Sequence, residues 1–430
     1  MNFSNCIKYS NNVNYSPNGN YLAIAKGNNL LIYESNQMKN LFKYSFTSQI
    51  TQIEFSQDSS FILIGLYKLG QCEVKSLLDE NWKCKINESL FGISNSIWTP
   101  DNSKILCFSN CNVKLSIWSL TEECQAQYIS LPKFSDKGYS FSSNGHFFAL
   151  AERKEIKDYI GVYYIADFSL MSHFNINTVD AQDIVWSKDN TSIIASDCPL
   201  ECKILVYSPT GSLLMINEAY TNILGVTSLV LSPNGHYITG GYGDSSIRLY
   251  NHITYKQISI LKHQLTEETF KGEQCYIFRE VEFNIEQNKK GTKFEALQYN
   301  NKLFNKIKST SEETGIDLID YSYDSNYLAS RLKNIPNILW IWQIASLSLS
   351  TIIIFKKDIN SFKWSPNEHK IIIGTDNSKC YVYTLNNIYV VELPTVDITV
   401  KTIKWNYDGR SFLLCDKYKL LIGFSEIDQI

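Results

Sequence analysis

The sequence predicts an all-β fold in which repeated small sheets are arranged as the blades of a propeller. Three observations lead to this prediction: short apolar strands follow one another along the chain, one turn motif recurs nine times, and most copies lie about 40–45 residues apart. A period of this length with four strands per unit is typical of a propeller blade. The aromatic share of 13% also favours strands over helices.

The turn motif is an apolar strand that ends in an aromatic residue, followed by Ser, any residue, and then Asp or Asn. The Ser-equivalent positions are Ser16, Ser56, Thr99, Ser142, Ser187, Ser232, Ser322, Ser365 and Asn406. Two residues later stand Asn18, Asp58, Asp101, Asn144, Asp189, Asn234, Asp324, Asn367 and Asp408. Asp and Asn tolerate left-handed backbone angles and accept hydrogen bonds from nearby N–H groups. We therefore expect these side chains to hold each turn.

Each turn is followed by an apolar strand, as at 21–25, 61–65, 147–151 and 370–374, and then by another, as at 30–33, 115–118, 204–207 and 247–250. Short strands bounded by turn signals indicate an all-β fold. Nine copies are compatible with a single ring of nine blades, or with a ring of seven or eight and the remainder packed alongside. We expect the two ends of the chain to be joined by strand exchange, because an unpaired terminal blade would expose an edge.

One interval is irregular, since Ser232 and Ser322 are 90 residues apart. We interpret residues 1–263 as repeats one to six, 264–315 as a polar insertion whose composition is compatible with disorder, and 316–430 as repeats seven to nine. The alternative is a degenerate tenth unit with strands at 275–283 and 294–299.

Composition excludes several classes of function. The net charge of −3 gives no basic excess, so nucleic-acid binding is not expected. The N-terminus does not resemble a signal peptide, and no apolar run is long enough for a membrane span, which places the protein in the cytoplasm. The 11 scattered cysteines are expected to be free thiols. Cys107 with Cys111, and Cys198 with Cys202, lack histidines at metal-binding spacing.

No cofactor site or catalytic constellation is apparent in the sequence. Gly240, Gly241 and Gly243 are not followed by Lys-Ser or Lys-Thr, so they do not form a phosphate loop. The chain also lacks Gly-x-Ser-x-Gly, and its adjacent carboxylates have no partner at a defined spacing. We therefore predict a protein-binding scaffold that is not an enzyme and uses no cofactor or metal.

Residues 240–250, Gly-Gly-Tyr-Gly-Asp-Ser-Ser-Ile-Arg-Leu-Tyr, resemble the ending of a WD repeat. Tyr250 stands where that ending usually has Trp, and segments 115–118 and 340–342 fit the same position. The resemblance implies that Asp244 is a structural turn residue and that His263 is the family's structural histidine. Most of the other repeats are degenerate.

Further segments resemble one branch of this family: 1–4, 82–86, 149–154 with 157–159, 200–205, and 334–342. They are similar to the WD-repeat family that mammals encode antisense to a p53-family gene, and the similarity extends over the whole chain. It implies a scaffold at the centrosome or spindle pole that anchors microtubule minus ends and supports spindle and centriole or cilium assembly. The implied partners are a coiled-coil protein of the type that binds synovial-sarcoma-X-related protein and, in some lineages, a minus-end-directed kinesin.

The residues of these segments are candidates for partner contacts, because loops on a rigid scaffold carry recognition. They are Trp82, Glu152, Arg153, Lys154, Lys157, Asp158, Asn334 and Pro336. Each also has a simpler interpretation. The charged segment can be a solvated turn, Trp82 can pack in an outer strand, and 334–336 can be a rigid link.

Two other functions compete with the scaffold. Some translation-initiation factors use irregular nine-bladed propellers, so binding to ribosomal subunits is the main alternative. A hydrolase or lyase that uses the central channel is a weaker one, because fold alone never settles function and the predicted inner strands carry mostly apolar and small residues.

Overall fold

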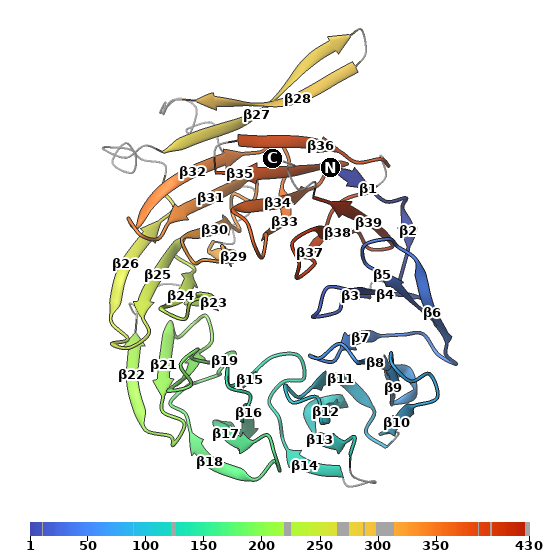
Figure 1. Cartoon of the computed structure of the whole chain (residues 1–430). Coiled ribbons are helices and arrows are strands. Elements are labelled where there is room, and N and C mark those ends of the chain that lie inside the picture. Colours follow the sequence, from blue (N-terminus) through green and yellow to red (C-terminus); the bar gives the residue numbers. More distant parts are fainter. Residues whose placement is uncertain are drawn as a thin grey trace. The chain divides into compact units, whose positions relative to one another are not determined.

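The computed structural model describes residues 1–10, 12–88, 90–121, 126–218, 225–264, 275–286, 289–297, 314–385, 387–395 and 398–425. They belong to two compact units, an N-terminal unit (Lys8–Ala219) and a C-terminal unit (Met1–Ile7 with Tyr220–Ile430). The described residues form nine β-sheets, which we number in chain order (Figure 1). The predicted all-β propeller fold is confirmed, with one sheet as the blade of each repeat.

The N-terminal unit contains sheets 1 to 5, and in each of them four consecutive strands pair antiparallel in chain order. Sheet 1 is β3 (Val13–Tyr15), β4 (Tyr21–Lys26), β5 (Asn29–Glu34) and β6 (Asn40–Ser45). Sheet 2 is β7 (Gln52–Phe55), β8 (Phe61–Leu66), β9 (Gln71–Ser76) and β10 (Lys83–Asn87). Sheet 3 is β11 (Ile93–Trp98), β12 (Lys104–Ser109), β13 (Lys114–Ser119) and β14 (Ala126–Ser130). Sheet 4 is β15 (Tyr139–Phe141), β16 (Phe147–Lys154), β17 (Lys157–Tyr164) and β18 (Leu170–Asn175), and sheet 5 is β19 (Asp183–Trp186), β20 (Ile193–Ser196), β21 (Lys203–Tyr207) and β22 (Leu213–Glu218). Two 3₁₀ turns, η1 (Tyr67–Leu69) and η2 (Asn110–Asn112), join the second and third strands of sheets 2 and 3.

The C-terminal unit contains sheets 6 to 9. Sheet 6 is β23 (Val226–Leu231), β24 (Tyr237–Tyr242), β25 (Ser246–Asn251) and β26 (Gln257–Lys262). Sheet 7 is β29 (Ile316–Tyr321), β30 (Tyr327–Leu332), β31 (Ile338–Gln343) and β32 (Ser348–Ile354), extended by β27 (Tyr276–Glu286) and β28 (Lys289–Leu297). Sheet 8 is β33 (Ile359–Trp364), β34 (Lys370–Thr375), β35 (Lys379–Thr384) and β36 (Asn387–Glu392). Sheet 9 is β37 (Thr402–Trp405), β38 (Ser411–Cys415) and β39 (Lys419–Phe424), joined by β1 (Asn2–Phe3) and β2 (Ile7–Lys8).

The turn motif has the same internal hydrogen bonds in its first seven copies. The Ser or Thr hydroxyl donates to the Asp or Asn side chain two residues later, over 2.5–2.7 Å. The same oxygen accepts from the backbone N–H five residues later, over 2.9–3.1 Å. Because these hydrogen bonds join residues no more than five positions apart, the motif is visible in the sequence.

The residue after the turn Asp or Asn is left-handed in most copies, as at Ser59, Asn102, Asn190 and Ser325, with φ near 60°. The side chain of each of these four residues accepts a hydrogen bond from the backbone of the turn motif in the preceding sheet. For example, Asn18 N–H donates to Ser59 Oγ over 3.1 Å, and Gln57 N–H donates to Asn102 Oδ1 over 2.7 Å. The motif therefore connects neighbouring sheets as well as the two strands of one sheet.

The hydrophobic core lies between successive sheets of each unit. Ala23 and Ile32 of sheet 1, for example, share one cluster with Ile53 and Ile64 of sheet 2. A further cluster joins sheets 4 and 5, and another joins sheets 7 and 8. Each sheet thus covers the apolar face of the next, and this packing holds the ends of the strands in fixed positions.

The expected strand exchange is present in the C-terminal unit. β1 pairs antiparallel with β39, with Asn2 opposite Phe424 and Phe3 opposite Gly423. Ser4 N–H also donates to the Ile422 carbonyl over 2.9 Å. The first residues of the chain therefore complete the sheet formed by the last ones, which removes an exposed edge.

The region predicted as a polar insertion lies between sheets 6 and 7, and its described residues include two strands close to those that the sequence offered at 275–283 and 294–299. Residues 265–274, 287–288 and 298–313 lie outside the described part of the chain, but β27 and β28 form a long antiparallel hairpin. β27 pairs in parallel with β32, so the hairpin widens sheet 7 and does not form a tenth blade. The apolar end of β32, Ile352–Ile354, offers an edge for pairing. The residues of β27 that pair with this edge are Tyr276 to Arg279, at the apolar start of the strand, although the average composition of the segment is polar.

Within the described ranges, no helix is long and apolar enough to cross a membrane.

Candidate functional site

The candidate site lies where the second strand of sheet 4 turns into the third. β16 and β17 are longer than the other second and third strands of the N-terminal unit, and they pair up to Lys154 opposite Lys157. The turn between them has only two residues, Glu155 and Ile156, with φ of 50° and 68°. The linkers 131–138 and 176–182, which enter and leave sheet 4, lie beside this turn.

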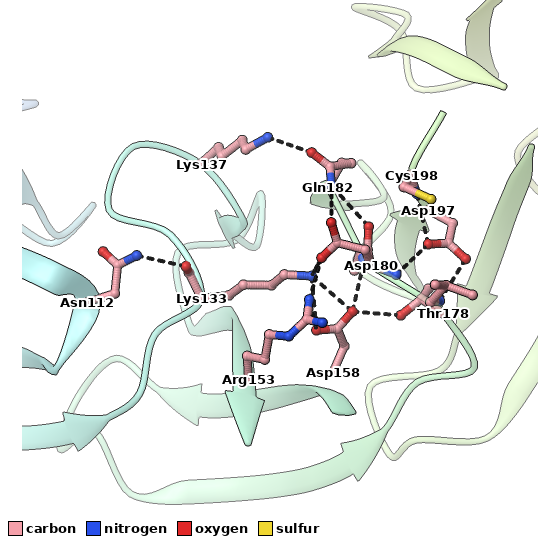
Figure 2. Close-up of polar contacts among 12 residues, drawn as sticks. Asn112, Lys133, Lys137, Arg153, Asp158, Thr178, Asp180, Gln182, Asp197 and Cys198 are labelled. Carbon is pink, nitrogen blue, oxygen red and sulfur yellow. Dashed lines mark hydrogen bonds and ion pairs between the residues drawn. The ribbon is translucent and has the colours of Figure 1, made fainter. Parts of the chain in front are cut away.

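Asp158 is the buried centre of the site, at 1% exposure. The Lys133 ammonium of the incoming linker lies 2.9 Å from each carboxylate oxygen. Oδ2 also accepts the Ala181 N–H over 2.7 Å and the Thr178 hydroxyl over 3.1 Å, both from the outgoing linker (Figure 2). One carboxylate therefore fastens both linkers to β17.

A second carboxylate, Asp180, lies at the edge of this cluster. It contacts Lys133 Nζ at 2.7 Å and pairs with the Arg153 guanidinium, which is also 3.6 Å from Asp158 (Figure 2). Partial burial alone would raise the pKa of Asp180. The hydrogen bonds and charges of Lys133 and Arg153 outweigh this effect and lower the pKa below its ordinary value. The two cations and two carboxylates form what we call the ionic network.

Further hydrogen bonds order the outgoing linker. Asp197, on the turn after β20, accepts the N–H groups of Val179 and Asp180 over 3.0 and 2.9 Å. Gln182 donates to Asp180 over 3.0 Å and accepts from Lys137 over the same distance. Asn112 of the preceding sheet donates to the Lys133 carbonyl over 2.8 Å. The loops of sheets 3, 4 and 5 are thus connected into one platform (Figure 2).

The chemistry of the platform is structural. Each of its carboxylates is paired with a cation or accepts hydrogen bonds from backbone N–H groups, and the carboxylate that the Thr178 hydroxyl contacts is held by Lys133. Among the described residues, no group of three or more His, Cys, Asp or Glu side chains could hold a metal ion. What this arrangement can do is hold several loops in a fixed geometry for binding.

The five charged residues predicted from segment 152–158 have three different surroundings in the structure. Arg153 and Asp158 belong to the ionic network, and Lys154 and Lys157 are exposed beside the turn. Glu152 instead accepts the Tyr163 hydroxyl over 2.7 Å and lies 3.0 Å from His173 Nε2. Burial and the Glu152 charge raise the pKa of Tyr163 above its usual value.

The other predicted contact residues lie away from the ionic network. Trp82 is partly buried, and its ring packs against Phe61 with centroids 4.8 Å apart, so it fits the packing interpretation. Asn334 and Pro336 lie in the C-terminal unit, in the half-buried turn before β31, where the Pro336 carbonyl accepts the Ile359 N–H over 3.0 Å.

The turn aspartates have the local contacts described for the motif at Asp58, Asp101, Asp189 and Asp324. Asp408 accepts the Arg410 N–H over 2.8 Å. Asp244 lies at a different turn, between β24 and β25, where it accepts from Ser246 and lies 2.6 Å from Arg248 Nη2.

His263 forms a second buried network in the C-terminal unit. Its Nδ1 lies 3.0 Å from the Ser245 carbonyl, and its Nε2 lies 2.8 Å from Ser330 Oγ, which also accepts the Trp342 indole N–H over 3.2 Å. Burial lowers the pKa of His263 to about 3. The imidazole is therefore neutral, and this set is called the neutral network below.

Sequence reasoning missed Lys133, Asp180 and Asp197. They lie on three separate connections, and no repeat position or motif marks them. A charged residue directly after an apolar strand end, as Asp197 follows Ile193–Ser196, was the one available signal.

The fold and the loop platform define a WD-repeat β-propeller, a class that typically serves as a protein-interaction scaffold. The model of the WD domain, G-beta repeat, matches residues 211–251. The mouse WD repeat-containing protein WRAP73 is 32% identical over 99% of this chain and 96% of its own length. The chain belongs to the WRAP73 family of WD-repeat proteins.

An uncharacterized WD repeat-containing protein of Schizosaccharomyces pombe is 23% identical over 73% of this chain and 66% of its own length. Two solved structures share the fold. A eukaryotic initiation factor has a TM-score of 0.60 at 11% identity, covering 89% of this chain and 87% of its own. The C-terminal WD40 domain of Sif2 has a TM-score of 0.51 at 12% identity, covering 91% and 97%. At these identities the likeness concerns the fold alone.

Proposed function

We propose that this protein is a non-catalytic scaffold of the cytoplasm that acts at the centrosome, spindle pole or an equivalent microtubule-organising centre. There it anchors microtubule minus ends and supports spindle and centriole or cilium assembly through a coiled-coil partner, with a minus-end-directed kinesin as a further partner in some lineages. The observation that supports this proposal is the end-to-end similarity to WRAP73, at 99% and 96% coverage.

The platform of sheets 3 to 5 gives the scaffold a physical basis. Buried charges connect loops that differ in sequence from blade to blade, and such fixed loops suit partner recognition. Arg153 and Asp158 contribute by holding the platform, whereas Lys154 and Lys157 are available for contact. We infer no catalytic role for any of them.

The test is the localisation of the tagged full chain through mitosis. We expect a focus at each spindle pole that persists when microtubules are depolymerised, because an anchoring protein binds the pole itself. Conditional depletion should release minus ends and splay the poles. A diffuse signal throughout division, with the tag alone as control, would overturn the proposal.

Binding to ribosomal subunits is the alternative expected from the sequence. The initiation factor shares the fold at 11% identity, which does not favour its function here. Sedimentation of the tagged chain with ribosomal subunits, at a salt concentration that preserves initiation complexes, would favour the alternative over the spindle-pole scaffold.

A further inference from the structure

Exposed apolar side chains gather at one end of the sheets of the N-terminal unit. In an antiparallel sheet of four strands, the turn between the second and third strands and the linkers between sheets share one end. At this end, eight large side chains are exposed on sheets 2 to 5 and their linkers: Leu69, Leu90, Phe91, Val113, Leu131, Ile156, Val179 and Leu200. We call them the apolar arc. In the turns at the opposite end of these sheets, the exposed large apolar side chain among the described residues is Leu78, and Tyr164, Leu170 and Leu213 are exposed at the strand ends there.

Hydrogen bonds and ion pairs connect the loops that carry the arc. Lys114 Nζ pairs with Glu88 at 2.8 Å, which joins the loop of Leu90 to that of Val113. Leu131 N–H donates to the Val113 carbonyl over 3.1 Å, and Arg153 N–H donates to the Leu131 carbonyl over 3.2 Å. The ionic network and Asp197 then hold the loops of Val179 and Leu200. The loops that carry the arc are therefore connected to one another and preorganised for binding.

Ile156 is the residue that the fold alone explains least. It is 84% exposed and has a left-handed backbone with φ of 68°. A β-branched residue is rarely left-handed, because its side chain clashes with the backbone there. Tight two-residue hairpins normally place Gly or Asn at such a position. An exposed apolar side chain in a strained conformation points to function, since such outliers concentrate at binding sites.

The charges beside Ile156 indicate what it contacts. Lys154 and Lys157 lie directly opposite each other across the β16–β17 pair, and both are exposed. Like charges in directly opposed positions are unfavourable. Carboxylates on a partner would relieve this repulsion at the same time as an apolar side chain covers Ile156.

We propose that the apolar arc, with Ile156 at its centre and Lys154 and Lys157 beside it, binds a segment of a partner protein that carries both apolar and acidic side chains. The occupant is a protein segment, because Glu155 lies between the two lysines and gives the turn the mixed charge that suits paired side chains better than a uniformly anionic surface. This inference deepens the proposed scaffold function and rests on it only for the existence of a protein partner.

The experiment uses the full-length chain with a photo-crosslinking amino acid in place of Val179, expressed in dividing cells. Mass spectrometry identifies the crosslinked segment, which is synthesised as a peptide and titrated against the purified chain. We expect a segment rich in apolar and acidic residues. Ile156→Gly, and separately the pair K154E and K157E, should weaken peptide binding about tenfold or more, as loss of a central anchor does.

The matched control is Leu78→Gly, which removes a side chain of similar exposure, 82%, from the opposite end of sheet 2. It should leave peptide binding unchanged. Circular dichroism and thermal unfolding verify that each variant is folded, and Ile156→Gly should be at least as stable as the parent chain because it removes strain. Lost binding without lost stability separates a contact residue from a structural one.

Several results would overturn the proposal: no crosslink, a crosslinked segment that is basic or lacks apolar residues, or binding unaffected by the variants. Crosslinking to a second copy of this chain would assign the arc to self-association. Co-sedimentation with vesicles of phosphatidylcholine and phosphatidylserine that requires Ile156 would assign it to a membrane. If the binding-deficient variants still localise to the poles, the spindle-pole function holds without the arc. If the parent chain is absent from the poles, the spindle-pole function is contradicted but the binding surface is not.

Discussion

The ionic network of sheet 4 and the neutral network of sheet 7 each attach a linker to a middle strand of one sheet, but they are built differently. In both, a linker residue that precedes a sheet contacts that sheet's middle strands: Lys133 contacts Asp158 on β17, and His263 contacts Ser330 on β30. The neutral network uses uncharged hydrogen bonds inside the core. The ionic network uses four charges, two of them on the partly exposed side chains of Arg153 and Asp180.

The difference teaches what each network is suited to do. Buried uncharged hydrogen bonds hold a linker at a small cost in desolvation. Buried ion pairs are costly to desolvate and are weak evidence for stability, but they define geometry strictly. The ionic network also extends to the surface, where it orders the loops of the apolar arc. The neutral network serves the fold, whereas the ionic network serves the fold and a binding surface.

The largest expected effect comes from removing the centre of the ionic network. Asp158→Ala leaves the Lys133 ammonium at 4% side-chain exposure without its buried carboxylate. Breaking one partner of a buried pair costs about 3–5 kcal/mol, so the free energy of unfolding should fall by that amount. Urea unfolding measures the change.

Lys26→Ala is the control for this prediction, because Lys26 ends the second strand of sheet 1, beside the corresponding turn, and is exposed. Its effect should stay within about 0.5 kcal/mol. A loss below about 1 kcal/mol for Asp158→Ala would mean that the two carboxylates are redundant, and the comparison between the networks would fail.

The two networks should also respond differently to pH. Folding lowers the pKa of His263 to about 3, whereas an unfolded imidazole has a pKa near 6.5. Between these values the unfolded chain binds a proton that the folded chain does not, so stability falls as the pH falls. From pH 7 to pH 5 the expected loss is about 2 kcal/mol.

The acidic member of the ionic network responds in the same direction but in a more acidic range, because the ordinary pKa of an aspartate lies well below that of an imidazole. Because the pKa of Asp180 is lowered on folding, its contribution is complete above the unfolded value and is lost only as the pH falls through the folded value. Urea unfolding of the parent chain and of His263→Gln at pH 7, 6 and 5 isolates the contribution of His263 to the pH dependence of the free energy of unfolding. Parallel curves for the two proteins would show that His263 is protonated in the folded chain.

The fold could be predicted from the sequence because its signal is local and repeated. Each turn motif closes its hydrogen bonds within five residues, as Ser16 does with Asn18 and Tyr21, so the pattern survives although most repeats are degenerate. The sequence offered strands at 275–283 and 294–299, close to β27 and β28, but as part of a tenth unit. Their place in sheet 7 was not predicted, because the pairing of β27 with β32 joins segments more than 70 residues apart.

The candidate site was predictable only in part. Arg153 and Asp158 stand in one conspicuous charged segment, and the sequence marks them together. Lys133 and Asp180 meet them across linkers, and nothing in the sequence states which linker lies beside which turn. The left-handed conformation of Ile156 was also invisible, since Glu-Ile is not a turn sequence that favours it.

A smaller effect on stability is expected at the turn beside the ionic network. Its counterpart in sheet 1 contains Gly27, which is also left-handed. Ile156→Gly removes a conformational cost of about 1–2 kcal/mol and adds about 0.5–1 kcal/mol of backbone entropy, a net gain of about 0.5–1 kcal/mol. Gly27→Ala should destabilise by about 1 kcal/mol, purely through conformation, because an added Cβ meets nothing within 4 Å. Thermal unfolding should show shifts of opposite sign, and equal signs would contradict the assignment of strain to Ile156.

The smallest effect tests the opposed lysines beside the same turn. Lys157→Glu converts the pair with Lys154 into opposite charges, which should raise the free energy of unfolding by about 0.5 kcal/mol at low salt. Because both side chains are exposed, the gain should vanish near 1 M salt, where the screening length is about 3 Å. In sheet 1 the residue opposite Lys26 is the uncharged Asn29, so Lys26→Glu should show no salt-dependent gain. A loss of stability in Lys157→Glu would mean that Lys157 already has a favourable partner within the chain, and its charge would then not be available to a partner protein.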